Sequence, residues 1–137
     1  MDIIRRNTDY ALRSMVHLAQ EYGNGPVSTS SIAQAQNFSY QLACKLMQRL
    51  GKAGLVASCM GIRGGYTLTR PPREISLKNV IETIQGPLSL SRCLLGVDRC
   101  CQRHTCAIQG KLGELQGQMA AFLDGTTLQD LLKAKAG

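Results

Sequence analysis

Aromatic residues and long apolar segments are scarce in this chain. Its 137 residues include four Tyr, two Phe and no Trp, so it has few rings on which unpaired bases could stack, as single-stranded nucleic acid requires. No apolar run approaches the roughly 20 residues that span a bilayer, and the first residues lack the apolar centre of a secretion signal. We therefore expect a cytoplasmic protein with no membrane partner.

Acidic residues are missing from one long stretch. No Asp or Glu lies between Glu21 and Glu74, although six Lys and Arg residues do, and the whole chain has a formal net charge of +7. A merely solvated surface usually mixes both signs, so this stretch indicates a face that meets phosphate groups. Since aromatic residues are few, double-stranded DNA is the better candidate partner.

The spacing of apolar residues predicts a mainly α-helical fold with a small β-hairpin, in three segments. Residues 1–86 read as a winged helix-turn-helix DNA-binding domain, residues 87–106 as a cysteine-rich loop, and residues 107–137 as a long dimerisation helix followed by a short tail helix. A length of 137 residues is enough for a real hydrophobic core, so disulfides are not needed to hold the domain together.

Polar residues with capping side chains mark where the helices begin. Asn7 or Thr8 is placed to cap a first helix that runs to Tyr22, and a second helix begins in the cluster 28–30. A fourth helix begins at Ser76 and stops before a Gly-Pro pair. Two helices followed by a third of suitable composition are the pattern of a helix-turn-helix.

The third helix, SYQLACKLMQRL, has one apolar face and one basic, amide-rich face. Arg and Lys suit guanine edges and phosphates, and Gln suits adenine edges, so the basic face is typical of a helix that enters a major groove. The hairpin after it, residues 55–69, carries Arg63 at its turn and predicts a DNA-contacting wing, the alternative being an ordinary surface turn. The candidate DNA-binding residues are Ser39, Tyr40, Gln41, Lys45, Gln48, Arg49, Lys52, Arg63 and Gly64.

An apolar stripe with steps of three and four residues runs along the segment that begins at Ala107. Such a narrow heptad stripe favours a helix that pairs with a second copy of the chain, although packing on its own domain is the alternative. The stripe consists of Ile108, Leu112, Leu115, Met119 and Phe122.

Four of the six cysteines lie in the loop of residues 87–106 that precedes this helix. Cys93, Cys100 and Cys106 offer three thiolates, with Cys101 as an alternative to Cys100, which is one short of the four ligands of a closed metal site. No CxxC pair is present, which disfavours zinc. A reversible disulfide switch and an inert loop are the other interpretations of this segment.

Taken together, these motifs resemble the Rrf-two family of bacterial transcription regulators, over nearly the whole chain. The resemblance is carried by TDYALRSMVHLA, KLMQRLGKAGLV, GIRGGYTLTRPP, ISLKNVIETIQGPL and the three-cysteine loop before the long helix. It implies a homodimer whose long helices cross, with an iron-sulfur cluster, 2Fe-2S or 4Fe-4S, held by Cys93, Cys100 and Cys106. Some members of the family have no cluster.

The resemblance also suggests a fourth cluster ligand. IscR-like members place a histidine where this chain has Gln109, whereas NsrR-like members use an aspartate from the opposite subunit at the position of Asp9. Asp9 of the partner subunit is therefore favoured over His104, although a carboxylate in the first turn of a helix can also simply favour the helix dipole. Met60 stands where an arginine is usual in the wing, which leaves Arg63 as the residue that inserts into the groove.

These patterns predict a homodimeric repressor that binds a palindromic operator under control of a cluster sensing redox state, nitric oxide or iron-sulfur status. One alternative is a regulator of the same fold without a cluster, acting through cysteine thiols or a protein co-regulator. Another, of a different class, is an iron-sulfur electron carrier or cluster-delivery protein. No catalytic constellation is recognisable, so we do not expect an enzyme.

Overall fold

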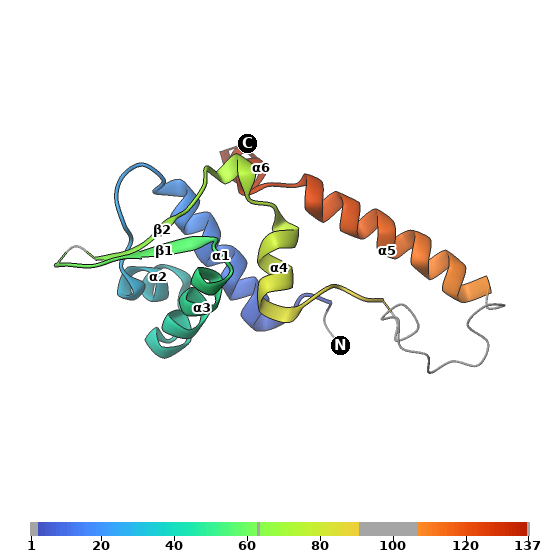
Figure 1. Ribbon diagram of the computed structural model, residues 1–137, viewed down its shortest axis with the longest axis horizontal. Helices are drawn as coiled ribbons and strands as arrows, with labels where there is room; N and C mark the ends of the chain where they lie inside the picture. Colours follow the sequence, from blue (N-terminus) through green and yellow to red (C-terminus); the bar gives the residue numbers. More distant parts are fainter. Residues whose placement is uncertain (1–2, 63, 91–106, 137) are drawn as a thin grey trace.

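A winged-helix head and one long projecting helix make up the structure, a computed structural model that describes residues 3–62, 64–90 and 107–136 (Figure 1). This arrangement confirms the predicted fold class, mainly α with one antiparallel hairpin. The elements in chain order are α1 Arg6–Gln20, α2 Thr29–Gln36, α3 Tyr40–Lys52, β1 Val56–Cys59, β2 Gly65–Leu68, η1 Pro72–Glu74, α4 Leu77–Gln85, α5 Ala107–Gly125 and α6 Leu128–Ala136.

Serine caps begin three of the helices, as predicted. The Ser28 hydroxyl accepts a hydrogen bond from the backbone N–H of Ser31 at the start of α2. The Ser39 hydroxyl accepts one from the backbone N–H of Leu42 at the start of α3. Ser76 and Asn79 form a reciprocal capping box at the start of α4. At the end of α2, Asn37 adopts a left-handed conformation with φ of 56°, which stops the helix before α3 begins.

The prediction for the first helix was wrong at both ends. The helix begins at Arg6 rather than at Asn7 or Thr8, because the Thr8 hydroxyl does not cap it but donates to Oε1 of Gln85 at 2.6 Å. It ends at Gln20, so Tyr22 lies beyond it and is 43% exposed instead of continuing the apolar face.

The wing is a two-stranded hairpin in which Val56 pairs with Leu68. The segment before α2 joins its base, because the backbone groups of Val27 and Tyr66 exchange two hydrogen bonds of 2.9 and 2.8 Å. Gly65 makes this close approach possible, since a Cβ atom there would overlap the carbonyl of Val27. The hairpin is thereby tied to the helix-turn-helix.

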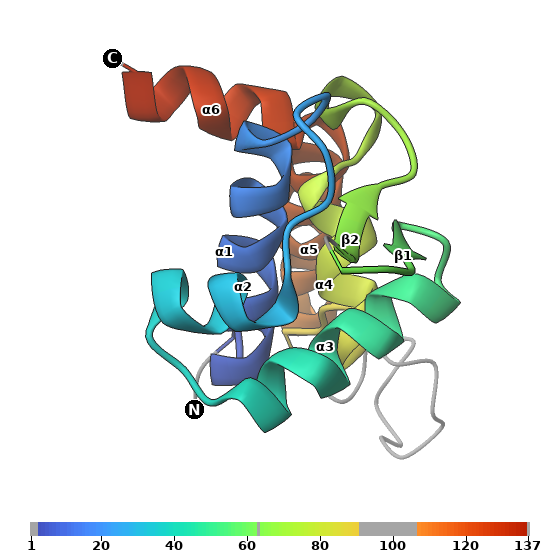
Figure 2. The same ribbon diagram turned by 90° about the vertical axis from the view of Figure 1, so that its left-hand side faces the viewer.

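The core of the head lies between α1, α3, α4 and the base of the wing. Figure 2 shows α3 running across the head below α1, with the hairpin beside it. The fully buried apolar side chains belong to these elements, to α2, to residue 75 before α4 and to the last helix; they include Met15, Leu18, Ile32, Leu46, Met47, Leu50, Ile75, Val80, Ile81 and Leu128.

The tail helix α6 belongs to the head, which the sequence did not predict. The backbone N–H of Leu77 donates to the Thr126 carbonyl at 2.9 Å, and that of Leu128 donates to the Ile75 carbonyl at 3.0 Å. Leu128 is fully buried in the core, and α6 packs against α1. The head thus contains residues from both ends of the chain.

Helix α5 projects from the head between α4 and α6 (Figure 1). It packs against α4, but none of its residues is buried within the single chain. No helix in the described part of the chain is long and apolar enough to cross a membrane.

Candidate nucleic-acid interface

The predicted recognition helix α3 has two chemically distinct faces in the structure. Ala43, Leu46, Met47 and Leu50 are buried in the core. The five polar residues predicted to contact DNA all lie on the exposed side of the helix: Gln41, Lys45, Gln48, Arg49 and Lys52. A cap and four core contacts therefore hold the helix while its basic face stays open to a partner.

At the start of α3, Tyr40 and Cys44 lie one helical turn apart and interact with each other. Tyr40 is 56% exposed. Its pKa is raised above the usual value, first by a hydrogen bond to the Cys44 side chain and then by electrostatic interaction with Cys44, slight desolvation and electrostatic interaction with Tyr66. A phenol is protonated at neutral pH in any case, and the raised pKa of Tyr40 strengthens that state, so its O–H is available as a hydrogen-bond donor at this face.

Arg49 has a structural contact besides its exposed position. Its Nη2 atom donates to the carbonyl oxygen of Ile84 at 2.9 Å, which joins the last turn of α3 to the end of α4. The predicted contact of Arg49 with DNA stays a prediction, and a substitution there would also remove this link between helices. Lys45 and Gln48 are better positions than Arg49 for testing DNA binding, because substitutions there do not remove the link to Ile84.

The wing contributes one predicted residue within the described part of the chain. Gly64 donates its N–H to the Gly61 carbonyl at 2.9 Å, and a Cβ atom on Gly64 would lie 2.8 Å from that same oxygen. Glycine is thus required by the turn itself. Arg63 lies outside the described residues.

The tip of the wing is also apolar, which sequence reasoning did not use. Met60 and Ile62 are almost wholly exposed, at 96% and 107%. Apolar side chains at an exposed turn beside a basic helix are suited to contact with thymine methyl groups or sugar edges. The signal in the sequence was two large apolar residues among turn glycines.

The predicted dimerisation stripe is largely uncovered. Ile108 and Phe122 are each 69% exposed and Leu115 is 47% exposed, whereas Leu112 and Met119 are partly buried. Isolated exposed apolar residues are common, but an aligned set on one projecting helix indicates a surface that another molecule covers.

The candidate cluster ligands divide between described and undescribed parts of the chain. Cys93, Cys100, Cys101, His104 and Cys106 all lie outside the described residues. Asp9 lies in the first turn of α1, where its Oδ2 atom pairs with Nε of Arg13 at 3.1 Å, and its side chain is 46% exposed. In the residues that are described, no three His, Cys, Asp or Glu side chains gather as a metal site.

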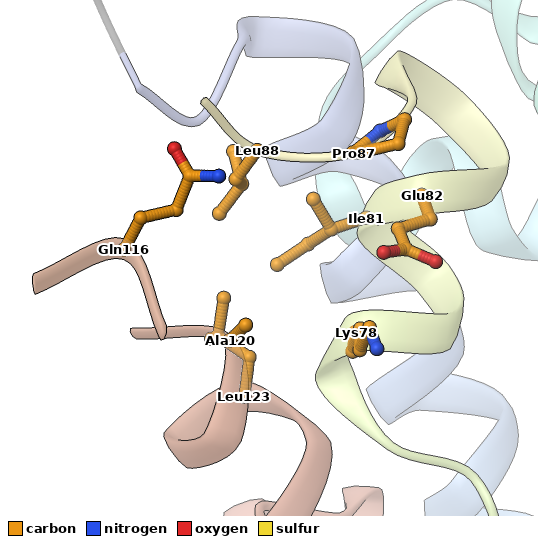
Figure 3. Close-up of a pocket in the computed structure, with 8 residues that line it drawn as sticks. All are labelled: Lys78, Ile81, Glu82, Pro87, Leu88, Gln116, Ala120 and Leu123. Atoms are coloured by element: carbon orange, nitrogen blue, oxygen red, sulfur yellow. The ribbon is translucent and has the colours of Figure 1, made fainter. Parts of the chain in front are cut away.

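A hollow of about 210 Å³ separates α4 from α5 (Figure 3). Ile81 and Leu88 point into it from the side of the head, and Ala120 and Leu123 face them from α5. The Leu90 N–H donates to Oε1 of Gln116 at 3.0 Å, so the chain that leaves the head toward the cysteine segment is fastened to the long helix. The residues that line this hollow provide packing contacts, and no group of them is arranged for catalysis.

Comparisons with known proteins give a consistent assignment. The model of the Rrf2 family, described as an iron-dependent transcriptional regulator, matches residues 4–134. The regulator CymR of Bacillus subtilis is 35% identical over 89% of this chain and 83% of its own length, and the regulator IscR of Aliivibrio salmonicida is 32% identical over 90% and 73%.

A solved structure of the global cysteine regulator CymR of B. subtilis superposes with a TM-score of 0.84 at 32% identity and covers 98% of both chains. The family model and these relatives are transcriptional regulators and not enzymes, in agreement with the sequence. The chain belongs to the Rrf2 family of transcriptional regulators, the family that its sequence motifs resemble.

Proposed function

We propose that the chain is a homodimeric repressor that binds a palindromic DNA operator and is controlled by an iron-sulfur cluster. The observation that carries the DNA-binding part is α3, whose core face is fully packed while its Gln, Lys and Arg side chains are exposed together. A DNA partner implies action in the cytoplasm, which forms part of the proposal.

The proposed dimer is supported by α5. Ile108, Leu115 and Phe122 expose large apolar surfaces along one side of a helix that projects from the head. A second copy of the same helix would cover them, and two heads on a two-fold axis match two operator half-sites.

The donor set of the sequence fits an iron-sulfur cluster in kind. Cys93, Cys100 and Cys106 would supply thiolates, and Asp9 of the partner subunit would supply an oxygen ligand; Cys101 and His104 are the alternatives. Asp9 is partly exposed, but its present partner Arg13 would have to share or release it. A bound cluster would be lost or chemically modified in response to oxidants, nitric oxide or a change in iron supply. The iron-dependent description of the family supports this part.

The chain's own contacts suggest how the cysteine segment could influence DNA binding. In the sequence, that segment lies between Leu90, whose backbone N–H donates to Gln116 of α5, and the start of α5 at Ala107. A rearrangement there would change how α5 lies against α4, and with it the separation of the two recognition helices in the dimer.

Two measurements test this function. Selection from a random pool of duplex DNA should yield a palindromic site, and Lys45→Ala with Gln48→Ala should abolish binding to it, while Lys133→Ala on α6 should not. Protein purified without oxygen should be coloured and contain iron and sulfide in comparable amounts. A colourless, iron-free protein whose DNA binding is insensitive to oxidants would refute the cluster, and an absence of selected DNA would refute the regulator.

A regulator without a cluster is the second candidate, favoured by the resemblance to CymR, which is named as a cysteine regulator. Such a protein would act through thiol chemistry or a protein co-regulator. Native mass spectrometry separates these outcomes, because a cluster, a disulfide and a bound protein add different masses. An electron carrier or cluster-delivery protein would instead show no sequence-selective DNA binding.

A further inference from the structure

The start of α1 forms a second basic surface beside the recognition helix. Arg5, Arg6 and Arg49 line one shallow hollow together with Asn7, Thr8, Ile84 and Gln85, and no acidic residue lines it. In the described part of the chain neither Arg5 nor Arg6 forms an ion pair, and the carboxylate of Asp9 pairs with Arg13. Among the described residues, the hollow therefore gathers three positive charges with no acidic side chain in its lining.

The backbone that carries these arginines is fixed by a glutamine. Oε1 of Gln85 accepts hydrogen bonds from the Arg5 N–H at 3.0 Å and from the Thr8 hydroxyl at 2.6 Å, while Nε2 donates to the Ile3 carbonyl at 2.8 Å. The N-cap residue Arg5 makes no side-chain capping bond, so the first N–H groups of α1 contribute positive partial charge beside the hollow, which Asp9 in the same turn offsets in part. The backbone from which the two arginine side chains extend is thus held in place before any partner arrives.

The hollow is continuous with the proposed DNA face. Arg49 belongs to both surfaces, since it lies on α3 one helical turn, about 6 Å, beyond Lys45 and donates to Ile84 at the edge of the hollow. DNA in contact with α3 would therefore pass its backbone close to the start of α1.

We propose that Arg5, Arg6 and the uncapped start of α1 form a phosphate-binding surface that grips the DNA backbone next to the recognition helix. This inference rests on the proposed DNA-binding function and extends it to residues outside the recognition helix and the wing. Contacts of this kind set affinity and register without reading sequence. Removing them weakens binding to every duplex in similar proportion.

The test compares salt dependence on two labelled duplexes, the one selected from a random pool and a scrambled version. Each phosphate contact contributes about 0.9 to the slope of log K against log salt, which is about a 3.5-fold loss of affinity from about 50 mM to about 200 mM salt. Arg5→Gln with Arg6→Gln should lower this slope by up to about 1.8 per subunit and leave the ratio of the two affinities unchanged.

Three controls sharpen this result. Arg5→Lys with Arg6→Lys keeps the charges and should keep the slope, whereas Lys133→Gln removes a distant charge and should leave it unchanged. Circular dichroism melting should be unaltered in the Gln variant, because Gln85 contacts the Arg5 backbone and not its side chain. An unchanged slope in the Arg5→Gln, Arg6→Gln variant, or an equal fall with Lys133→Gln, overturns the proposal. A wild type that binds no DNA overturns the underlying function instead.

Discussion

Truncation of Leu128 tests whether the last helix is a structural part of the head. The side chain is fully buried, and its backbone N–H donates to Ile75 at 3.0 Å. Leu128→Ala would lose the transfer free energy of the removed carbons and leave a cavity in the core. We expect a loss of about 2–5 kcal/mol in the free energy of unfolding. Since whole domains are stable by about 5–15 kcal/mol, this is a large fraction.

Urea denaturation followed by circular dichroism measures that loss. The midpoint should fall with little change in slope, and the melting temperature should fall by at least several degrees. Lys133→Ala is the matched control on the same helix, because its side chain is exposed and its removal should change stability by less than about 0.5 kcal/mol. If Leu128→Ala behaves like the control, α6 is not part of the core and the reasoning fails.

Three further predictions concern the wing, the dimer and pH. Gly65→Ala should lower the melting temperature and weaken DNA binding, because its Cβ would displace Val27 from β2; an unaltered melting curve would show that the strand adapts. Phe122→Asp should yield folded monomers by sedimentation, since the ring is 69% exposed in the single chain, and a persistent dimer would exclude this face. Hydrogen bonds from Thr127 hold the pKa of Asp130 below its usual value, so its contribution to stability is present above the unfolded-state pKa and is lost as the pH falls through the folded-state pKa. Asp130→Asn should therefore lower the melting temperature at neutral pH but less so in acid, and a difference that does not vary with pH would contradict this.

Local signals in the sequence were sufficient for most of the head. The serine caps at Ser28, Ser39 and Ser76 and the glycines around the wing act on neighbouring backbone, so their effect is visible within a few residues of sequence. The long helix that includes residues 107–125 and its apolar stripe likewise follow from spacing alone.

Contacts between distant segments explain the errors and omissions. The sequence predicts Thr8 as a possible cap, but its hydroxyl donates to Gln85, 77 residues away in sequence. Leu128 reads as part of a separate tail, yet it completes the core formed by residues from the other end of the chain. Arg49 matches the polar face of α3, and only its packing beside α4 reveals the bond to Ile84. Periodicity carries no information about such partners.

The candidate cluster site is the part that depends most on resemblance. Three thiols without a CxxC pair do not define a metal site by spacing, and the fourth ligand comes from a comparison with family members. The structure adds the position of Asp9 and its ion pair with Arg13. An anaerobic absorption spectrum of the wild type and of Asp9→Ala would therefore be the most informative measurement on this site.

The two hydrogen bonds that join residues 75–77 to residues 126–128 give the long helix a fixed point of attachment to the head. They fix the end of α5 near Gly125 to the head, while its other end, at Ala107, is about 28 Å away at 1.5 Å per residue over 19 residues. A rotation of about 10° at the fixed end would move the far end by about 5 Å over that length. The helix is thus a lever arm, on which a small event at one end becomes a displacement the size of a helical turn at the other.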